Sequence, residues 1–357
     1  MKIIHCADLH LDSKMETNLA PAKAKERKHE ILNTFERMVD YADQHDVTAI
    51  IIAGDMFDTA RVTNMTKTRV LNIIKKHAKI DFLYLSGNHD ESNFINLIGD
   101  VPTNLKIFGK SWTVFDYPGV KVTGVVMDES NCATIYDTLA LSKDDLNIVV
   151  LHGQIVPSSG KNKAGVINLT KLKNKNIDYL ALGHIHAFTQ GTLDQRGEYC
   201  YAGCLEGRGF DECGEKGFVL LEINCGVIKS NFVKFAQRQL IELSFDITGY
   251  EDWFTIEERI MQQVQNYDTA DLLKITLCGK YKIQLEKHIG MLEKKLNQFY
   301  FAKVKDDSVL AVTADDVAND VSLRGEFIRQ VLASNLSQVE KERTIIVGLR
   351  ALNGEDL

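Results

Sequence analysis

Long hydrophobic runs, secretion signals and repeated segments are all missing from this sequence of 357 residues. None of its apolar stretches approaches the roughly 20 residues that a helix needs to cross a bilayer. No signal peptide pattern opens the chain, and no internal repeat or low-complexity tract interrupts it. These absences predict a soluble, cytoplasmic, globular protein without membrane association.

Excess positive charge is missing as well, because 42 lysines and arginines face 49 aspartates and glutamates, for a net charge of -7. This balance argues against a protein that coats nucleic acid by bulk attraction, but it allows a local basic groove. A lysine-rich patch comprises residues 158–163 with Lys171, Lys173 and Lys175. It is either a contact for a phosphate backbone or a solvated loop and helix face, and the lack of interleaved aromatic residues favours the second interpretation.

Paired cysteine spacings are also absent. The seven cysteines are an odd number, which suits a reducing cytoplasm better than a disulfide framework. Cys200, Cys204, Cys213 and Cys225 lie close together in the sequence, but they lack the paired short loops of zinc ribbons and fingers. We therefore expect free thiols that serve as small apolar residues on strands and turns.

A buried-strand pattern that ends in a carboxylate is the main feature that is present: residues 49–53 are apolar, and Gly54 and Asp55 follow. Apolar runs of this kind are typical of strands in parallel sheets, and sites form at the carboxyl ends of such strands. We expect five such strands to deliver polar side chains to one edge. The other four runs with the same design cover residues 3–10, 82–90, 148–153 and 179–186.

Helical patterns separate the first strands. Residues 23–46 and 66–78 each place apolar side chains on one stripe, as in crossover helices. Residues 101–126 contain short runs broken by glycine and proline, which suggests an antiparallel part of the sheets. The order strand, helix, strand, helix, strand predicts an α/β fold, a two-sheet sandwich flanked by helices, over residues 1–238.

A second, smaller unit begins near Leu240, because apolar and polar residues start to alternate there. The patterns predict a small α/β module of three strands and two helices over residues 239–312, with Thr255 and Glu258 as a capping box for its first helix. Residues 313–357 contain only helical patterns. These form two amphipathic pieces, which we expect to be separated by the charged residues 340–343, and which either dock on a partner or fold back on the cap or the catalytic domain.

The polar residues at the five strand ends are all of metal-binding types. Residues two apart on an extended segment point to the same side, so Asp8 pairs with His10, and His184 with His186. The set is too large for one tetrahedral ion but suits two ions that share a carboxylate, with Asp55 as the natural bridge. The predicted ligands are Asp8, His10, Asp55, Asn88, His152, His184 and His186.

Two such ions, about 3.5–4 Å apart, would support hydrolysis of a phosphoester. Imidazoles with carboxylates and an amide suit Mn, Fe or Zn better than Mg or Ca, and we expect Mn. His89 directly follows the predicted ligand Asn88, and neighbouring side chains on an extended segment point to opposite sides. We therefore expect His89 to face the substrate as a hydrogen-bond donor or acid, oriented by Asp90. Asp58 is a candidate for orienting a ligating histidine. The histidines without such context, which we assign to core or surface, are His5, His29, His45, His77 and His288.

At these motifs the sequence resembles the calcineurin-like metallophosphoesterases. Within that superfamily it most resembles the DNA repair exonucleases of the SbcD type. The motifs that carry the resemblance are Asp8-Leu9-His10, Gly54-Asp55-Met56-Phe57-Asp58, Gly87-Asn88-His89-Asp90, His152-Gly153 and Gly183-His184-Ile185-His186. Residues 201–206 are similar to the family's Tyr-Pro-Gly-Ser stretch, with Ala202 and Cys204 as departures.

The resemblance implies roles for individual residues and for whole segments. It assigns one ion to Asp8, His10, Asp55 and His186, and the other to Asp55, Asn88, His152 and His184. It makes His89 the acid that contacts the phosphate. It also implies that residues 239–312 form a cap and that residues 313–357 bind an SMC-like ATPase of the SbcC type.

Three functions follow from these observations. The first is a metal-dependent exonuclease or endonuclease of DNA double-strand-break repair that works with the ATPase. In this function two copies of the present chain could form a homodimer. The second is a phosphodiesterase or phosphatase for a small nucleotide, which the acidic composition favours. The third is a structural subunit that binds DNA ends without cutting them, which the complete ligand set disfavours. Residues that bind the substrate are not predicted.

Overall fold

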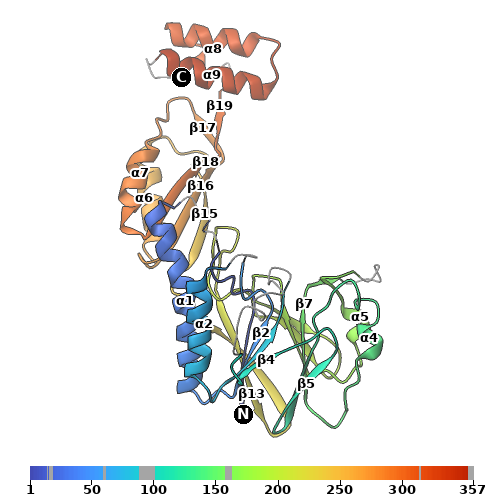
Figure 1. Cartoon of the computed structure of the whole chain (residues 1–357). Coiled ribbons are helices and arrows are strands. Elements are labelled where there is room, and N and C mark those ends of the chain that lie inside the picture. Colours follow the sequence, from blue (N-terminus) through green and yellow to red (C-terminus); the bar gives the residue numbers. More distant parts are fainter. Residues whose placement is uncertain are drawn as a thin grey trace. The chain divides into compact units, whose positions relative to one another are not determined.

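The structure is a computed structural model of the chain (Figure 1). It describes residues 1–13, 15, 19–58, 62–87, 101–156, 163–312 and 315–352. Contacts between residues divide the chain into two compact units, Met1–Gln239 and Leu240–Leu357, here called the first and second unit. No helix among the described residues is both long enough and apolar enough to cross a membrane.

Two six-stranded sheets form the first unit. The strands of one, in spatial order, are β14 (Val227–Lys234), β13 (Gly217–Asn224), β1 (Lys2–Cys6), β2 (Ala49–Ala53), β3 (Asp81–Leu85) and β4 (Leu105–Ile107). Those of the other are β11 (Thr189–Thr192), β12 (Glu198–Tyr201), β10 (Tyr179–Gly183), β7 (Asn147–His152), β6 (Val120–Gly124) and β5 (Thr113–Tyr117). The central pairs β1–β2, β2–β3 and β7–β10 are parallel.

Residues 101–126, for which the sequence suggested antiparallel strands, also contain strands that pair in parallel with their neighbours. The β5–β6 hairpin is antiparallel, as expected, but β4 joins β3 in parallel and β6 joins β7 in parallel. The expectation was wrong for β4 because a three-residue strand carries too little pattern to show which neighbour it pairs with.

The core lies on both faces of the first sheet. In β2, Ile51 and Ala53 face the second sheet, whereas Ile50 and Ile52 pack under the helices. Successive side chains of a strand point to opposite faces, so a strand covered on both sides is apolar throughout. This is why residues 49–53 form an unbroken apolar run.

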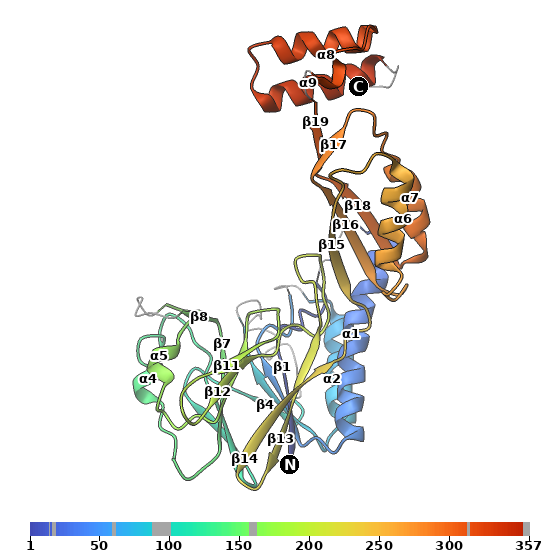
Figure 2. The ribbon, with the colours of Figure 1, turned by 180° about the vertical axis from the view of Figure 1, so that it is seen from behind.

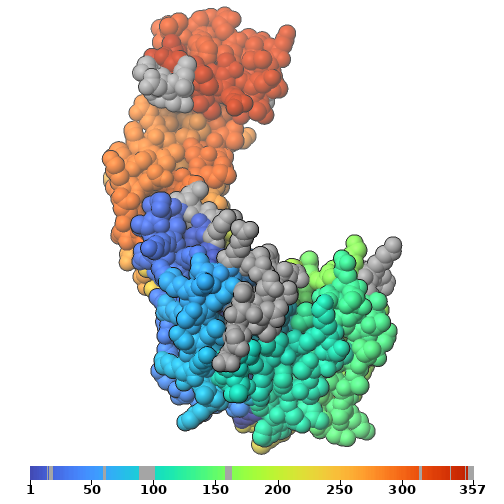
Figure 3. Space-filling model, in the orientation of Figure 1, coloured from blue at the N-terminus to red at the C-terminus, as the bar shows by residue number. Residues whose placement is uncertain are grey.

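Helices cover the outer faces of the sheets. α1 (Pro21–Gln44) and α2 (Asn64–Lys76) lie on one side of the two-sheet core, and the short α4 (Ile135–Thr138) and α5 (Leu169–Leu172) lie on the other (Figures 1 and 2). The sides of α1 and α2 that point away from the sheets form part of the molecular surface in Figure 3. A small sheet pairs β8 (Gln154–Val156) with β9 (Val166–Asn168). The predicted α/β fold, a two-sheet sandwich flanked by helices, is confirmed.

The second unit contains a parallel three-stranded sheet, β15 (Leu240–Asp246), β16 (Leu272–Cys278) and β18 (Phe301–Asp306). Its apolar face packs against α6, α7 and η1, and β17 pairs with β19. The bounds of these elements are α6 (Trp253–Val264), β17 (Lys280–Lys282), α7 (Ile289–Lys295), η1 (Leu296–Gln298) and β19 (Val309–Ala311). The expected capping box at Thr255 is wrong, because Asp252 is the N-cap and accepts a hydrogen bond from the Thr255 amide at 2.8 Å.

Two helices, α8 (Leu323–Ala333) and α9 (Gln338–Leu352), follow the short η2 (Asp315–Val317). The break expected at residues 340–343 is wrong, since α9 runs through them and the connection lies at residues 334–337. Ser337 and Glu340 explain the difference. The Glu340 side chain accepts from the Ser337 amide at 2.8 Å, and the Ser337 hydroxyl accepts from the Glu340 amide at 3.4 Å, so the two residues form a capping box that starts the helix.

Candidate metal centre

Five strand ends meet between the two sheets. β1, β2 and β3 belong to the first sheet, and β7 and β10 belong to the second. Asp8 and His10 follow β1, Asp55 follows β2, His152 ends β7, and His184 and His186 follow β10. The expected single edge is therefore two edges that face each other, and β2 contacts both β7 and β10.

Close approach of the strand ends depends on glycine. Gly54 has φ of +96°, and a Cβ there would lie 2.0 Å from Nδ1 of His152. At Gly87 a Cβ would lie 2.1 Å from Oδ1 of Asp55. Both distances are far inside van der Waals contact, so neither position has room for a side chain. These glycines bring the ends of β2, β3 and β7 to one place.

The ligand side chains converge in a different way from the one expected. Asp8, His10, Asp55 and His184 all have positive φ, of 50°, 43°, 49° and 108°. Non-glycine residues adopt this conformation at a cost, and such residues cluster at functional sites. The argument from alternation along an extended segment is therefore wrong here, because β1 ends at Cys6 and β10 ends at Gly183.

Backbone hydrogen bonds hold these strained residues. The Asp8 amide donates to the Gly54 carbonyl at 3.1 Å, and the His10 amide donates to the Asp55 carbonyl at 3.0 Å. The His184 amide donates to both carboxylate oxygens of Asp8 at 2.9 Å. The loops after β1, β2 and β10 are thus tied directly to one another.

Two groups of ligand atoms result. In the first, Asp8, His10 and His186, and in the second, Asp8, Asp55 and His152, the ligand atoms lie within 4.8 Å of one another. The Nε2 atoms of His10 and His186 are 3.1 Å apart. Asp8 belongs to both groups, and Oδ2 of Asp55 lies 3.4 Å from Nε2 of His152 in its own group and 4.0 Å from Nε2 of His10 in the other.

The chemistry of this donor set fits divalent cations. Asp8 and Asp55 are 1% and 2% exposed, and a buried carboxylate is costly without a cation beside it. Burial raises the pKa of the Asp8 carboxyl above its ordinary value. The Nδ1 of His152 lies 2.9 Å from the Ala53 carbonyl, to which it donates, so Nε2, which faces Asp55, is the ring atom that could bind a cation. His184 lies beside it, with ring centroids 5.5 Å apart.

Outside the ligands, carboxylates contact two of the imidazoles. Oδ1 of Asp58 lies 3.1 Å from Nδ1 of His10, where the sequence predicted an orienting residue. Oε1 of Glu212 lies 2.7 Å from Nδ1 of His186. This hydrogen bond raises the pKa of His186. Burial opposes ionisation of Glu212, but His186 and Arg208 outweigh it and hold the pKa of Glu212 below its usual range.

Sequence reasoning missed Glu212 and Arg208. Both lie in the connection between β12 and β13, where no strand pattern ends in a ligand. Arg208 contacts Asp58 and Glu212 at once, at 2.7 Å in each case. Arg208 and Glu212 are four positions apart, but Asp58 is 150 positions away from Arg208, and nothing in the local sequence indicates that the three residues meet.

Asn88, His89 and Asp90 lie outside the described residues, as do residues 158–162 of the lysine-rich patch. The patch lysines Lys163, Lys171, Lys173 and Lys175 are described, and the Lys171 ammonium lies 5.3 Å from the centre of the Tyr136 ring. Cys200 and Cys204 are buried free thiols. In the part of the chain that the structure describes, the groups of potential ligand atoms contain no cysteine.

Two partly shared groups of imidazole and carboxylate ligands, set at the carboxyl ends of strands, define the class of dinuclear metal-dependent hydrolases. Residues 1–188, more than half of the chain, match the family described as Calcineurin-like phosphoesterase. The chain belongs to this family and is a metal-dependent phosphoesterase. The resemblance seen in its motifs is confirmed.

Relatives with assigned names extend the match. The chain is 22% identical over 375 residues to "DNA double-strand break repair protein Mre11" of Sulfolobus acidocaldarius, covering 100% of this chain and 96% of the relative. It is 27% identical over 297 residues to "Uncharacterized metallophosphoesterase YhaO" of Bacillus subtilis, covering 78% and 72%. It is 23% identical over 362 residues to "DNA double-strand break repair protein Mre11" of Saccharolobus solfataricus, covering 96% and 91%.

Proposed function

We propose that this protein hydrolyses phosphodiester bonds in DNA, as an exonuclease or endonuclease of double-strand-break repair. The observation that carries the proposal is the convergence of aspartate and histidine ligands from two sheets on one site. The similarity to a double-strand-break repair protein over the whole chain supports DNA as the substrate.

The two ligand groups suggest how two ions would be held. Asp8, His10 and His186 would hold one, and His152, His184 and Asn88 would hold the other, with Asp55 shared between them. When bound, two divalent cations supply an activated water and positive charge at the phosphoryl oxygens. We expect Mn, with Fe or Zn as alternatives, because imidazole ligands suit these metals.

The protein's own side chains orient the ligands and move a proton. The Ala53 carbonyl accepts a hydrogen bond from Nδ1 of His152, and the Asp58 carboxylate, 3.1 Å from Nδ1 of His10, would orient that ring. His89, oriented by Asp90, is proposed to donate a proton to the departing oxygen. A histidine suits this role because its pKa lies near neutrality.

One assay distinguishes the candidate functions. Purified protein with Mn²⁺ is compared on linear duplex DNA, single-stranded DNA, cyclic dinucleotides and a generic phosphodiester. Cleavage of DNA ahead of the small nucleotides is the expected result. Faster turnover of a cyclic dinucleotide would favour a small-nucleotide phosphodiesterase, which the net charge of -7 supports. Binding of DNA ends without turnover of any phosphodiester would indicate the structural subunit.

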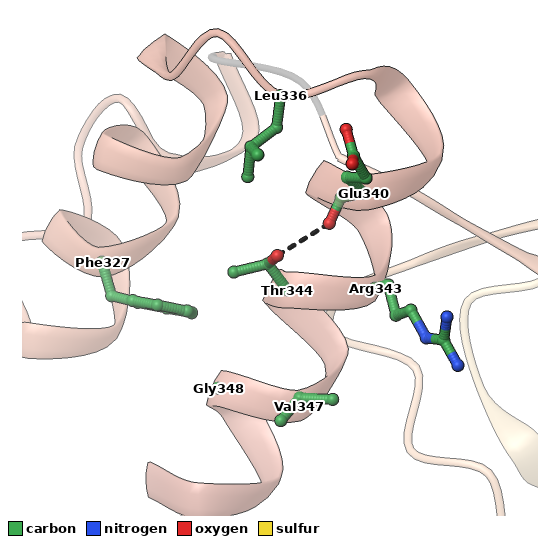
Figure 4. A pocket seen from close by; sticks show the side chains of 7 residues that line it. All are labelled: Phe327, Leu336, Glu340, Arg343, Thr344, Val347 and Gly348. Carbon is green, nitrogen blue, oxygen red and sulfur yellow. Dashed lines mark hydrogen bonds between the residues drawn. The ribbon is translucent and has the colours of Figure 1, made fainter.

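The chain's organisation is proposed in three parts: a catalytic domain of residues 1–238, a cap of residues 239–312, and a helical docking segment of residues 313–357. The proposed partner of the last part is an SMC-like ATPase. A groove between α8 and α9 supports this role (Figure 4). It has a volume of about 530 Å³ and is lined by Phe327, Leu336, Glu340, Arg343, Thr344, Val347 and Gly348.

The helices also pack against their own unit. Ile328, Val331 and Ile345 form a small core with Val317 and with Leu310 of β19. The apolar residues of the two helices are therefore partly buried within the second unit. Those that remain exposed are Leu323, Leu336, Val339, Ile346, Val347 and Leu352. Helix-in-groove recognition, in which an amphipathic helix lies in an apolar groove with anchors every three or four residues, suits the groove between α8 and α9.

A further inference from the structure

Arg208 joins two carboxylates beside the candidate metal centre. Its Nη1 donates to Oδ1 of Asp58 at 2.7 Å, and its Nη2 donates to Oε1 of Glu212 at 2.7 Å. The Arg208 backbone amide donates to the other oxygen of Glu212, also at 2.7 Å. The planar guanidinium presents its donors in a rigid fork, so it sets the separation and the orientation of the two carboxylates.

Each of these carboxylates in turn contacts an imidazole of the same ligand group. Asp58 lies 3.1 Å from Nδ1 of His10, and Glu212 lies 2.7 Å from Nδ1 of His186. On the other side of the rings, the two Nε2 atoms are 3.1 Å apart. A chain of contacts therefore leads from one imidazole through Asp58, Arg208 and Glu212 to the other.

The segment that carries Arg208 is anchored on both sides. Buried Glu206 accepts from the Thr34 hydroxyl at 2.8 Å, and Arg27 donates to the Gly207 carbonyl at 2.8 Å, which ties the segment to α1. Lys216 donates to the His186 carbonyl at 2.8 Å. The guanidinium is thus held by rigid surroundings and can hold other groups in place.

The second ligand group is oriented without this chain of contacts. The Nδ1 of His152 meets the Ala53 carbonyl of β2 at 2.9 Å, and His152 itself is the last residue of β7. A change at Arg208 or Glu212 therefore acts on one half of the centre and leaves the other half in place.

We infer that Arg208 and Glu212 are positioning residues that preform the His10–His186 half of the metal centre. This inference rests on the proposed two-metal function. Without the bridge, each imidazole can rotate about the bonds of its side chain. The affinity of this half of the site for its ion is then lower. Residues that orient ligating histidines typically account for about 10- to 100-fold in metal affinity.

Two conservative variants and one control test the inference. Arg208→Lys keeps the charge, but one ammonium cannot reproduce the bidentate fork. Glu212→Gln keeps the size of the side chain and removes its charge. The control, Arg196→Ala, removes a similar arginine–carboxylate pair with Asp178, which lies at the opposite end of β10 from His184. For each protein, bound Mn²⁺ is measured in metal-buffered solution, together with the electron paramagnetic resonance spectrum and the melting temperature of the metal-free form.

The control is expected to bind two ions per chain, as the unsubstituted protein does. Arg208→Lys and Glu212→Gln are expected to keep one ion at unchanged affinity and to bind the other about 10- to 100-fold more weakly. Their spectra should then change from that of a coupled Mn pair to that of a single Mn²⁺. The metal-free melting temperatures should stay within the range of the control.

Equal affinity for both ions in the variants and in the unsubstituted protein would overturn the inference. So would an equal weakening of both ions, or a lowered metal-free melting temperature with loss of both, because the segment would then serve the fold as a whole. If the unsubstituted protein binds no Mn²⁺, this result would instead contradict the proposed two-metal function.

Discussion

Asp55 lies close to imidazoles of both groups, since its Oδ2 is 3.4 Å from Nε2 of His152 and 4.0 Å from Nε2 of His10. We predict that Asp55→Asn abolishes hydrolysis and weakens both ions together, because the amide removes the negative charge that both would share. Metal analysis and turnover of a generic phosphodiester check this. Two tightly bound ions with normal turnover would contradict the bridging role.

His89 is predicted to face the substrate and not a metal ion. The variant His89→Ala should keep its fold and its metal content while turnover falls by about 10²- to 10⁴-fold, the range expected for a positioned acid. His288→Ala, in the second unit, serves as the control. If His89→Ala purifies without metal, His89 is a ligand and the division of roles is wrong.

The ends of β2 and β7 lie close together at the site, and a substitution at Gly54 tests whether this close approach requires a residue without a side chain. Gly54 and Gly119 have similar φ, of +96° and +84°, but only at Gly54 does an added Cβ meet another residue, His152. We expect Gly119→Ala to cost only the backbone strain, about 1–2 kcal/mol. Gly54→Ala should destabilise more and should also reduce Mn²⁺ binding. Chemical denaturation and metal analysis measure the two effects, and equal effects of both variants would refute the steric argument.

The α8–α9 pair is the element whose role depends on a partner. Val347 lines the groove and is 45% exposed, so Val347→Asp should prevent co-purification with the ATPase and leave hydrolysis unchanged. Val227→Asp, at an exposed apolar position on β14, is the matched control. Cutting the chain after Asp320 is a weaker test, because Ile328 and Ile345 belong to a core with Leu310. Unchanged co-purification of Val347→Asp would exclude this groove as the docking surface.

For the molecule as a whole, metal binding and stability should be linked. Asp8 and Asp55 are buried close together, and cations that bind the folded chain alone stabilise it by about 2.7 kcal/mol at 100 times the dissociation constant. We expect Mn²⁺ to raise the melting temperature of the unsubstituted protein, and a chelator to reverse this. The rise should be smaller in Asp55→Asn. A melting temperature that does not respond to Mn²⁺ would contradict a buried metal centre.

The sequence by itself determined the central strands of the first unit, the two main helices and the types of residue at the strand ends. These are local properties: a strand buried on both faces is apolar throughout, as in residues 49–53, and the stripe of Ile31, Phe35 and Met38 marks α1. Asp8, His10, Asp55, His152, His184 and His186 could be named because each follows or ends such a strand.

Only the tertiary structure decided how these residues come together. The positive φ of Asp8 and His184 depends on hydrogen bonds between loops that are distant in the sequence, and the facing of the two sheets depends on strand order. Arg208 and Glu212 carry no local signal, since their role exists only where Asp58 and His186 are brought beside them. The local sequence pattern indicates which segments are buried and which types of side chain they carry. The orientation of the side chains at the site depends on contacts between residues far apart in the chain.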